Sequence, residues 1–332
     1  MKPFAYVNAA TERDVVAALS TERNRCLPIA GGTDLLALMK DFIVSPERLV
    51  NVKNLDSSIV AVDGGLRIGA AARLVDVVDH VAVRRRYPAL WTAAERLGTP
   101  QIRNQGTVGG NIMQRPRCWY YRNEEFNCLK KGGSRCHAVE GENKYHAIFG
   151  DGPCHIVHPS SLAVPIIVYG GRFRVVGPAG AREIDSGEFF QLPNVNLYGE
   201  TVLQPNEVLT HVVLPHASRV LTGSDLRSAT YEVRFRQSSD WPLATASVHL
   251  GLDGRAVRSA RVVVGAVAPV PWRVPAAERA LTGQVITEAT AADAAFAAVA
   301  GAKALSGNAY KIQIARTAVK RAILLAAGLP PV

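Results

Sequence analysis

The sequence lacks the signals of a membrane, secreted or nucleotide-hydrolysing protein. Its apolar runs are too short to cross a bilayer, and the N-terminal stretch MKPFAYVNAATERD has no apolar core of the signal-peptide type. It contains neither the G-x-G-x-x-G pattern of nicotinamide-binding folds nor the P-loop pattern. We therefore expect a cytoplasmic protein with reduced cysteines, unless a partner's signal peptide carries the folded complex into the periplasm.

Aromatic residues make up only 7% and charged residues 20% of the 332 residues. The formal net charge of +10 raises nucleic acid as a partner, but the Lys and Arg residues are scattered and no aromatic stacking motif lies between their short clusters. We expect a solvated surface or an acidic protein partner, and neither nucleic acid nor membrane. With 48% hydrophobic residues, the chain can form two or three domains with their own cores.

The stretch LPIAGGTDLLALMK has the features of a phosphate-binding loop. Leu27 to Ala30 reads as a short strand, Gly31-Gly32 as a turn, and Thr33 or Asp34 as the cap of the helix that follows. Glycines let backbone amides approach an anion closely, and a helix N-terminus adds partial positive charge. Two glycines before a helix are also common in simple tight turns, so this loop does not decide the question alone.

A second glycine loop, Gly106 to Asn111, follows in the stretch QIRNQGTVGGN. Its glycines allow close approach of the backbone to a ligand, and Thr107 and Asn111 add side-chain donors and acceptors. Two such loops, well separated in the sequence, fit one extended dinucleotide better than either loop fits alone.

Apolar spacing and turn signals predict the remaining elements. We expect strands over Tyr6–Asn8, Leu49–Val52, Leu66–Ala70, Ala163–Tyr169, Arg172–Val176, Glu207–Leu214, Ala229–Arg234, Leu243–Leu252 and Val257–Val267. We expect helices after a capping box at Thr11–Asp14 and over Leu74–Val81, Ala89–Leu97, Pro275–Leu281, Ala289–Leu305 and Ala309–Ala327.

Four of the five cysteines lie in one window, with the fifth, Cys26, placed elsewhere as a core residue. The window contains no C-x-x-C pair, which excludes an ordinary zinc ribbon and a bacterial ferredoxin run. Three interpretations stay open: a [4Fe-4S] cluster on four thiolates, structural zinc on cysteine and histidine, or buried cysteines without metal. The polar, glycine-rich contexts argue against the last. The four residues are Cys118, Cys128, Cys136 and Cys154.

Together these motifs resemble the FAD-binding medium subunit of the molybdenum hydroxylases, the xanthine dehydrogenase and carbon monoxide dehydrogenase family. The matching segments are Pro28–Lys40, Arg103–Gln114, His158–Ala163, Leu203–Pro215 and Ser306–Arg316, in order over nearly the whole chain. The cysteine-bearing insert, residues 115–157, is similar to that of the branch with 4-hydroxybenzoyl-CoA reductase and the periplasmic aldehyde oxidoreductases. That similarity implies a [4Fe-4S] cluster held by the four cysteines of the window.

The resemblance also implies which residues bind FAD. The pyrophosphate would lie on the first glycine loop, made of Leu27, Pro28, Ile29, Ala30, Gly31, Gly32, Thr33, Asp34 and Leu35. Thr107, Gly110 and Asn111 would hold the other side of the cofactor, with Leu209 near the isoalloxazine ring. Two positions depart from the family: a usual aspartate is replaced by Ser161, and a usual lysine after Tyr231 is absent, with Glu232 and Arg234 nearby.

The fold that the resemblance implies is α+β. Residues 1–58 and 59–218 would form a two-part FAD-binding unit of the vanillyl-alcohol oxidase type, and residues 225–332 a smaller sheet-and-helix domain. The function implied is electron transfer between FAD, the [2Fe-2S] clusters of a small subunit, a large molybdopterin-binding subunit and an external carrier. The substrate of the complex would be an aldehyde, an aromatic compound or a CoA ester. No catalytic acid, base or nucleophile is assigned to this chain. The alternatives are a stand-alone FAD oxidase and a zinc-stabilised nucleic-acid-binding protein.

Overall fold

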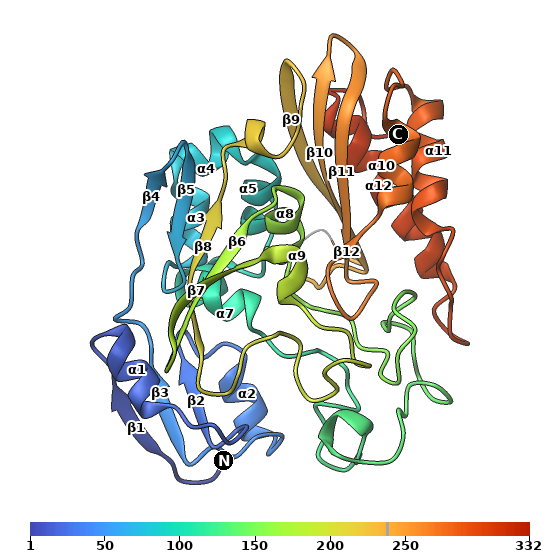
Figure 1. The fold of residues 1–332 in the computed structure, drawn as a ribbon. Coiled ribbons are helices and arrows are strands. Elements are labelled where there is room, and N and C mark those ends of the chain that lie inside the picture. Colours follow the sequence, from blue (N-terminus) through green and yellow to red (C-terminus); the bar gives the residue numbers. More distant parts are fainter. Residues whose placement is uncertain (237–238) are drawn as a thin grey trace.

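The computed structural model describes residues 1–236 and 239–332, whose strands form three sheets (Figure 1). The first sheet is parallel, with the order β1 (Ala5–Asn8), β3 (Arg48–Asn51) and β2 (Cys26–Ile29). Helices α1 (Glu12–Ala18) and α2 (Leu35–Lys40) connect its strands. The predicted capping box is confirmed, because the Asp14 amide donates to Thr11 Oγ1 and the Thr11 amide donates to the Asp14 carboxylate.

The second sheet is antiparallel and occupies the middle of the molecule (Figure 1). Its strands, in order across the sheet, are β4 (Ile59–Val62), β5 (Gly65–Gly69), β8 (Val208–Leu214), β6 (Arg172–Gly177) and β7 (Gly180–Asp185). The helices of this region are α3 (Leu74–Asp79), α4 (Val81–Arg86), α5 (Pro88–Glu95), α6 (Pro100–Gln105), α7 (Val108–Ile112), α8 (Ala163–Val168) and α9 (Ser186–Phe189).

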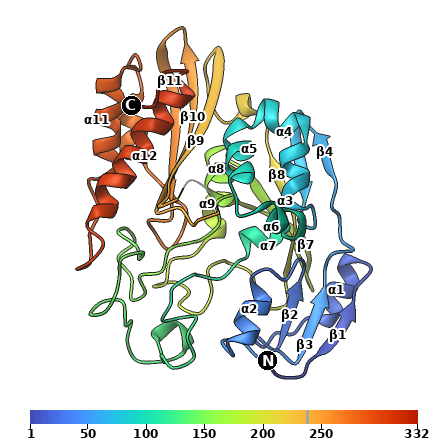
Figure 2. The ribbon, with the colours of Figure 1, turned by 180° about the vertical axis from the view of Figure 1, so that it is seen from behind.

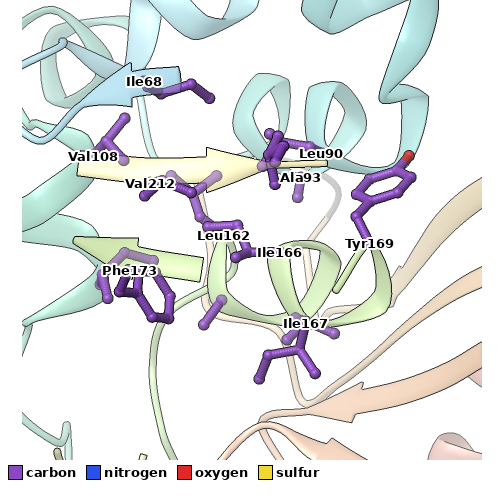
Figure 3. Packing of buried hydrophobic residues seen from close by; sticks show 14 of the residues in the cluster. Ile68, Leu90, Ala93, Val108, Leu162, Ile166, Ile167, Tyr169, Phe173 and Val212 are labelled. Atoms are coloured by element: carbon purple, nitrogen blue, oxygen red, sulfur yellow. The ribbon is translucent and has the colours of Figure 1, made fainter. Parts of the chain in front are cut away.

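The strand predicted over Ala163–Tyr169 is wrong, because this segment is helix α8. Every residue of α8 is buried, so its sequence is an unbroken apolar run without helical periodicity. The helix contacts α5 and also two strands of the third sheet, β10 (Ala244–Asp253) and β11 (Ala256–Gly265). Figure 3 shows Leu162 and Ile166 facing the core around Val212, while Ile167 points towards the strands of that third sheet.

The third sheet is antiparallel, with the order β12 (Trp272–Arg273), β11 (Ala256–Gly265), β10 (Ala244–Asp253) and β9 (Asp225–Val233). Helices α10 (Pro275–Leu281), α11 (Glu288–Val299) and α12 (Tyr310–Ala326) lie against it (Figure 2). These strands and helices confirm the elements predicted from the apolar spacing. Among the residues that the structure describes, none of the helices combines the length and the apolar character needed to cross a bilayer. The predicted domain boundaries stay a prediction.

Residues 115–157, the cysteine-bearing insert, fold into turns around the short 3₁₀ helix η1 (Leu129–Lys131). The start of α12 holds this insert in place. Lys311 is 1% exposed and its ammonium donates to three carbonyls, those of Tyr145 (3.1 Å), His146 (3.1 Å) and Ala266 (2.6 Å). Asn308 Nδ2 donates to the His146 carbonyl as well, at 3.1 Å. The motif SGNAYK (Ser306–Lys311) therefore connects the start of α12 to the insert.

Replacing Lys311 by Met should destabilise the protein, because buried carbonyls would lose their donor. Each unsatisfied buried acceptor costs about 1–3 kcal/mol, so we expect the free energy of unfolding to fall by about 3 kcal/mol. Lys320→Met, on the same helix, is the control, because Lys320 pairs with the exposed Glu288 and its loss should cost less than about 1 kcal/mol. Guanidinium unfolding followed by tryptophan fluorescence measures both; equal losses would contradict the role given to Lys311.

Candidate functional site: a flavin cavity beside a cysteine cluster

A cavity of about 510 Å³ lies where the first two sheets meet, with the β9–β10 loop on its wall. Every residue predicted to bind FAD lines it. These residues are Leu27, Pro28, Ile29, Ala30, Gly31, Gly32, Thr33, Asp34, Leu35, Thr107, Gly110, Asn111, Ser161 and Leu209. The structure thus brings the two glycine loops, the Ser161 segment and strand β8 to one place, as the sequence predicts.

The first glycine loop connects β2 to α2 in a tight turn. Gly32 has a φ of 71°, a left-handed conformation that glycine adopts without strain. The Leu36 amide donates to the Gly32 carbonyl at 3.1 Å, which begins the helix. Asp34 occupies the N-cap position, but its carboxylate makes no capping bond and is free to accept from other segments.

The second glycine loop begins helix α7, where the sequence had predicted only a loop. Thr107 Oγ1 caps this helix by accepting from the Gly110 amide at 3.1 Å. Asn111 Oδ1 accepts from the Ser160 hydroxyl at 2.7 Å and so fixes the segment that contains Ser161. The side-chain oxygens of Thr107 and Asn111 therefore hold the loop in position.

The two glycine loops are in direct contact. A Cβ on Gly31 would lie 2.0 Å from the carbonyl oxygen of Gln105, so no other residue fits there without displacing the backbone. The Gln105 side-chain amide donates back to the Gly31 carbonyl at 3.0 Å. Together these contacts fix the distance between the two loops.

Asp34 connects the flavin cavity to the cysteine-bearing insert. Its carboxylate accepts from the Arg115 amide at 2.8 Å, from Arg122 Nη2 at 2.5 Å and from Arg117 Nη2 at 3.0 Å. Burial lowers the pKa of Arg117 to about 10. These arginines were not predicted as part of the site, although the run RPRCWYYR places them next to Cys118.

Other cavity residues were also missed. Glu200 binds Arg115 at 2.9 Å and the buried Lys130 at 2.8 Å, and Trp241 packs under the Arg117 guanidinium at 4.6 Å. These residues lie far from the glycine loops in sequence, and their positions depend on the tertiary fold. Only the basic cluster at 115–122 gave a local signal.

All four cysteines of the window line a second, much smaller cavity, together with His137, His146 and His155. His146 Nε2 lies 3.2 Å from Cys118 Sγ. Burial raises the pKa of the Cys118 thiol to about 11. The neighbouring Cys154 thiol lowers the pKa of Cys136.

Among the described residues, no group of three or more His, Cys, Asp or Glu side chains is placed to hold a single metal ion. A tetrahedral zinc site needs four ligands on one ion. An iron–sulfur cubane instead takes one thiolate at each iron, so its four cysteines surround a common space. The donor set around this cavity fits that group, although the contact between Cys136 and Cys154 has to open to admit it.

The flavin cavity fits an extended anionic cofactor. The Gly31 and Gly32 turn exposes backbone without side chains, and Arg115, Arg117 and Arg234 bring positive charge to the wall. Among the described residues, the buried Nε atoms of Arg117 and Arg234 have no hydrogen-bond partner. These two N–H groups are free to donate, whereas the carboxylates of Asp34 and Glu200 on the same wall balance the charges of Arg117 and Arg115.

Comparison with known families gives two matches. Residues 2–217 match the family described as "FAD binding domain in molybdopterin dehydrogenase". Residues 212–326 match the family described as "CO dehydrogenase flavoprotein C-terminal domain".

Among characterised relatives, the chain is 37% identical to the aldehyde oxidoreductase FAD-binding subunit PaoB of Escherichia coli, over 85% of this chain and 87% of that one. It is 28% identical to the carbon monoxide dehydrogenase medium chain of Hydrogenophaga pseudoflava, over 96% of each. The structure of carbon monoxide dehydrogenase from the same organism superimposes with a TM-score of 0.75 at 26% identity, covering 98% of both chains.

Gly31→Ala should separate the two glycine loops and weaken FAD binding, because the new Cβ would overlap the Gln105 carbonyl. We expect the FAD content per chain of the purified variant to be at most about one tenth of the wild-type content. Gly187→Ala is the control, since its Cβ meets open space among the described residues. Full FAD content in the Gly31 variant, measured by absorbance after gel filtration, would show that the contact does not shape the cavity.

Proposed function

Because the chain belongs to the family of FAD-binding subunits of the molybdenum hydroxylases, we propose that it passes electrons between a partner subunit and an external carrier. As an oxidoreductase subunit of this family it binds FAD, which exchanges one or two electrons when bound. The observation that carries the proposal is the single cavity lined by both glycine loops. The chain's own residues bind and orient the cofactor.

The first glycine loop is proposed to bind the pyrophosphate and the second to bind the other side of FAD. Loop amides freed by the glycines serve as donors, while Arg115 and Arg117 supply positive charge. Leu209 gives the cavity an apolar surface from strand β8, which suits a flavin ring. No acid–base step is assigned to these residues.

We propose two partners, a large molybdopterin-binding subunit and a small [2Fe-2S] subunit. The relatives support this arrangement by their names, since a "medium chain" and an "FAD-binding subunit" are parts of larger enzymes. The aldehyde oxidoreductase subunit has the higher identity of the two, so an aldehyde is the substrate class we propose for the complex. The stand-alone oxidase and nucleic-acid alternatives gain no support from the comparisons.

We also propose that Cys118, Cys128, Cys136 and Cys154 hold a [4Fe-4S] cluster. The four thiols line one cavity, and the flanking arginines of Cys118 contact Asp34 on the flavin cavity. His146 is placed to donate to the Cys118 sulfur, which favours a ligand in its thiolate form. The cluster would thus lie beside the flavin within the same chain.

The cluster and the flavin can be tested separately in one set of variants. Co-expressed with its partner genes under iron-replete conditions, the wild-type chain should carry FAD and about four iron atoms. Each single Cys→Ala change at the four cavity cysteines should remove most of the iron and leave FAD bound. Ser134→Ala, a change at an exposed residue of the same insert that lines neither cavity, is the control and should keep both.

The two possible failures have different meanings. Iron that persists in all four variants would remove the cluster and leave the electron-transfer proposal. A wild-type chain that contains no flavin would overturn the proposed function itself. Iron and sulfide analysis together with the flavin absorbance spectrum distinguish these results.

A further inference from the structure

Glu232 and Arg234 form a buried ion pair at the wall of the flavin cavity. Their side chains are 1% and 9% exposed, respectively, and the Arg234 guanidinium donates to the Glu232 carboxylate. The two residues stand two positions apart at the end of strand β9, which places both side chains on one face. A buried pair of this kind is costly to desolvate, so its position calls for a reason.

Only one residue of the pair faces the cavity. Arg234 lines the cavity, whereas Glu232 lies behind it and contributes nothing to the lining. Arg234 Nη2 also donates to the Arg96 carbonyl at 2.8 Å, which holds the guanidinium against the end of α5. The positive end of the pair is therefore the end that faces the cavity.

Ser161 lies at the junction of the pair and the cavity. Ser161 lines the cavity. Burial raises the pKa of the Glu232 carboxyl, and the neighbouring Arg234 charge and Ser161 hydroxyl oppose that rise. The Glu232 carboxylate beside Ser161 comes from strand β9, and the Arg234 guanidinium neutralises its charge.

We propose that the Glu232–Arg234 pair tunes the flavin: Arg234 presents a positive charge that favours the reduced cofactor, and Glu232 moderates that charge from behind. Ser161 orients the carboxylate. The inference rests on FAD occupying this cavity. In a buried site the effect of one unit charge on a nearby ligand is large, because little water screens it. Both residues are tuning residues, and no bond to the cofactor is made or broken by them.

The test compares single changes that remove one charge each. At pH 8, with the solution potential held at the wild-type midpoint by a reference dye, Arg234→Met should lower the ratio of reduced to oxidised flavin by about tenfold. Glu232→Gln should raise this ratio by about tenfold, because it leaves the Arg234 charge uncompensated. The full-length chain is used with its FAD bound, and the flavin absorbance band reports the ratio.

Two further variants separate tuning from a structural role. Arg234→Lys keeps the charge and should stay within about threefold of the wild-type ratio, whereas loss of packing alone would affect it as much as Arg234→Met. Arg255→Met, on the turn between β10 and β11, is the matched control, since Arg255 is exposed and lies outside the cavity lining. If Arg234→Met and Glu232→Gln shift the ratio in the same direction, or not at all, the inference is wrong. A wild-type chain without FAD would instead overturn the proposed function.

Discussion

The close approach of Gly31 to the Gln105 carbonyl is the contact on which the cavity depends. It brings the turn after β2 against the end of α6, so that loops from two different sheets face the same space. Only a residue without Cβ permits this distance, and the Gln105 side chain then fixes it with a hydrogen bond to Gly31. Both loops line the cavity in which we propose that FAD binds.

Hydrogen bonds from two other parts of the chain fix the position of the cysteine cavity relative to this cavity. Asp34 accepts hydrogen bonds from the segment that leads into Cys118, and Lys311 donates to the carbonyls around His146. The N-terminus of α2 therefore positions one end of the insert, and the start of α12 positions the other. Arg234 adds a charge from the third sheet to the flavin wall. These contacts suit a flavoprotein subunit, in which the protein positions FAD and the cofactor itself carries out the redox chemistry.

The local motifs were predictable from sequence because their physics is local. The capping box, the strand–glycine–helix turns and the cysteine window each depend on residues a few positions apart. Helix α8 was mistaken for a strand because burial on all sides erases the periodicity that distinguishes the two. Helices α6 and α7 were missed because they are short and adjoin glycines, and strand β4 gave no clear alternation. Glu200 and Trp241 could not be assigned to the cavity, because long-range folding alone places them there.

The central claim is that two glycine loops bind one FAD, the first at its pyrophosphate and the second at its other side, and fragment binding tests it most directly. The chain, freed of its cofactor, can be titrated with FAD, FMN and ADP under identical conditions. If both loops contribute, FAD should bind about 10²- to 10⁴-fold more tightly than either fragment, because each end raises the effective concentration of the other. FMN or ADP binding as tightly as FAD would contradict the account.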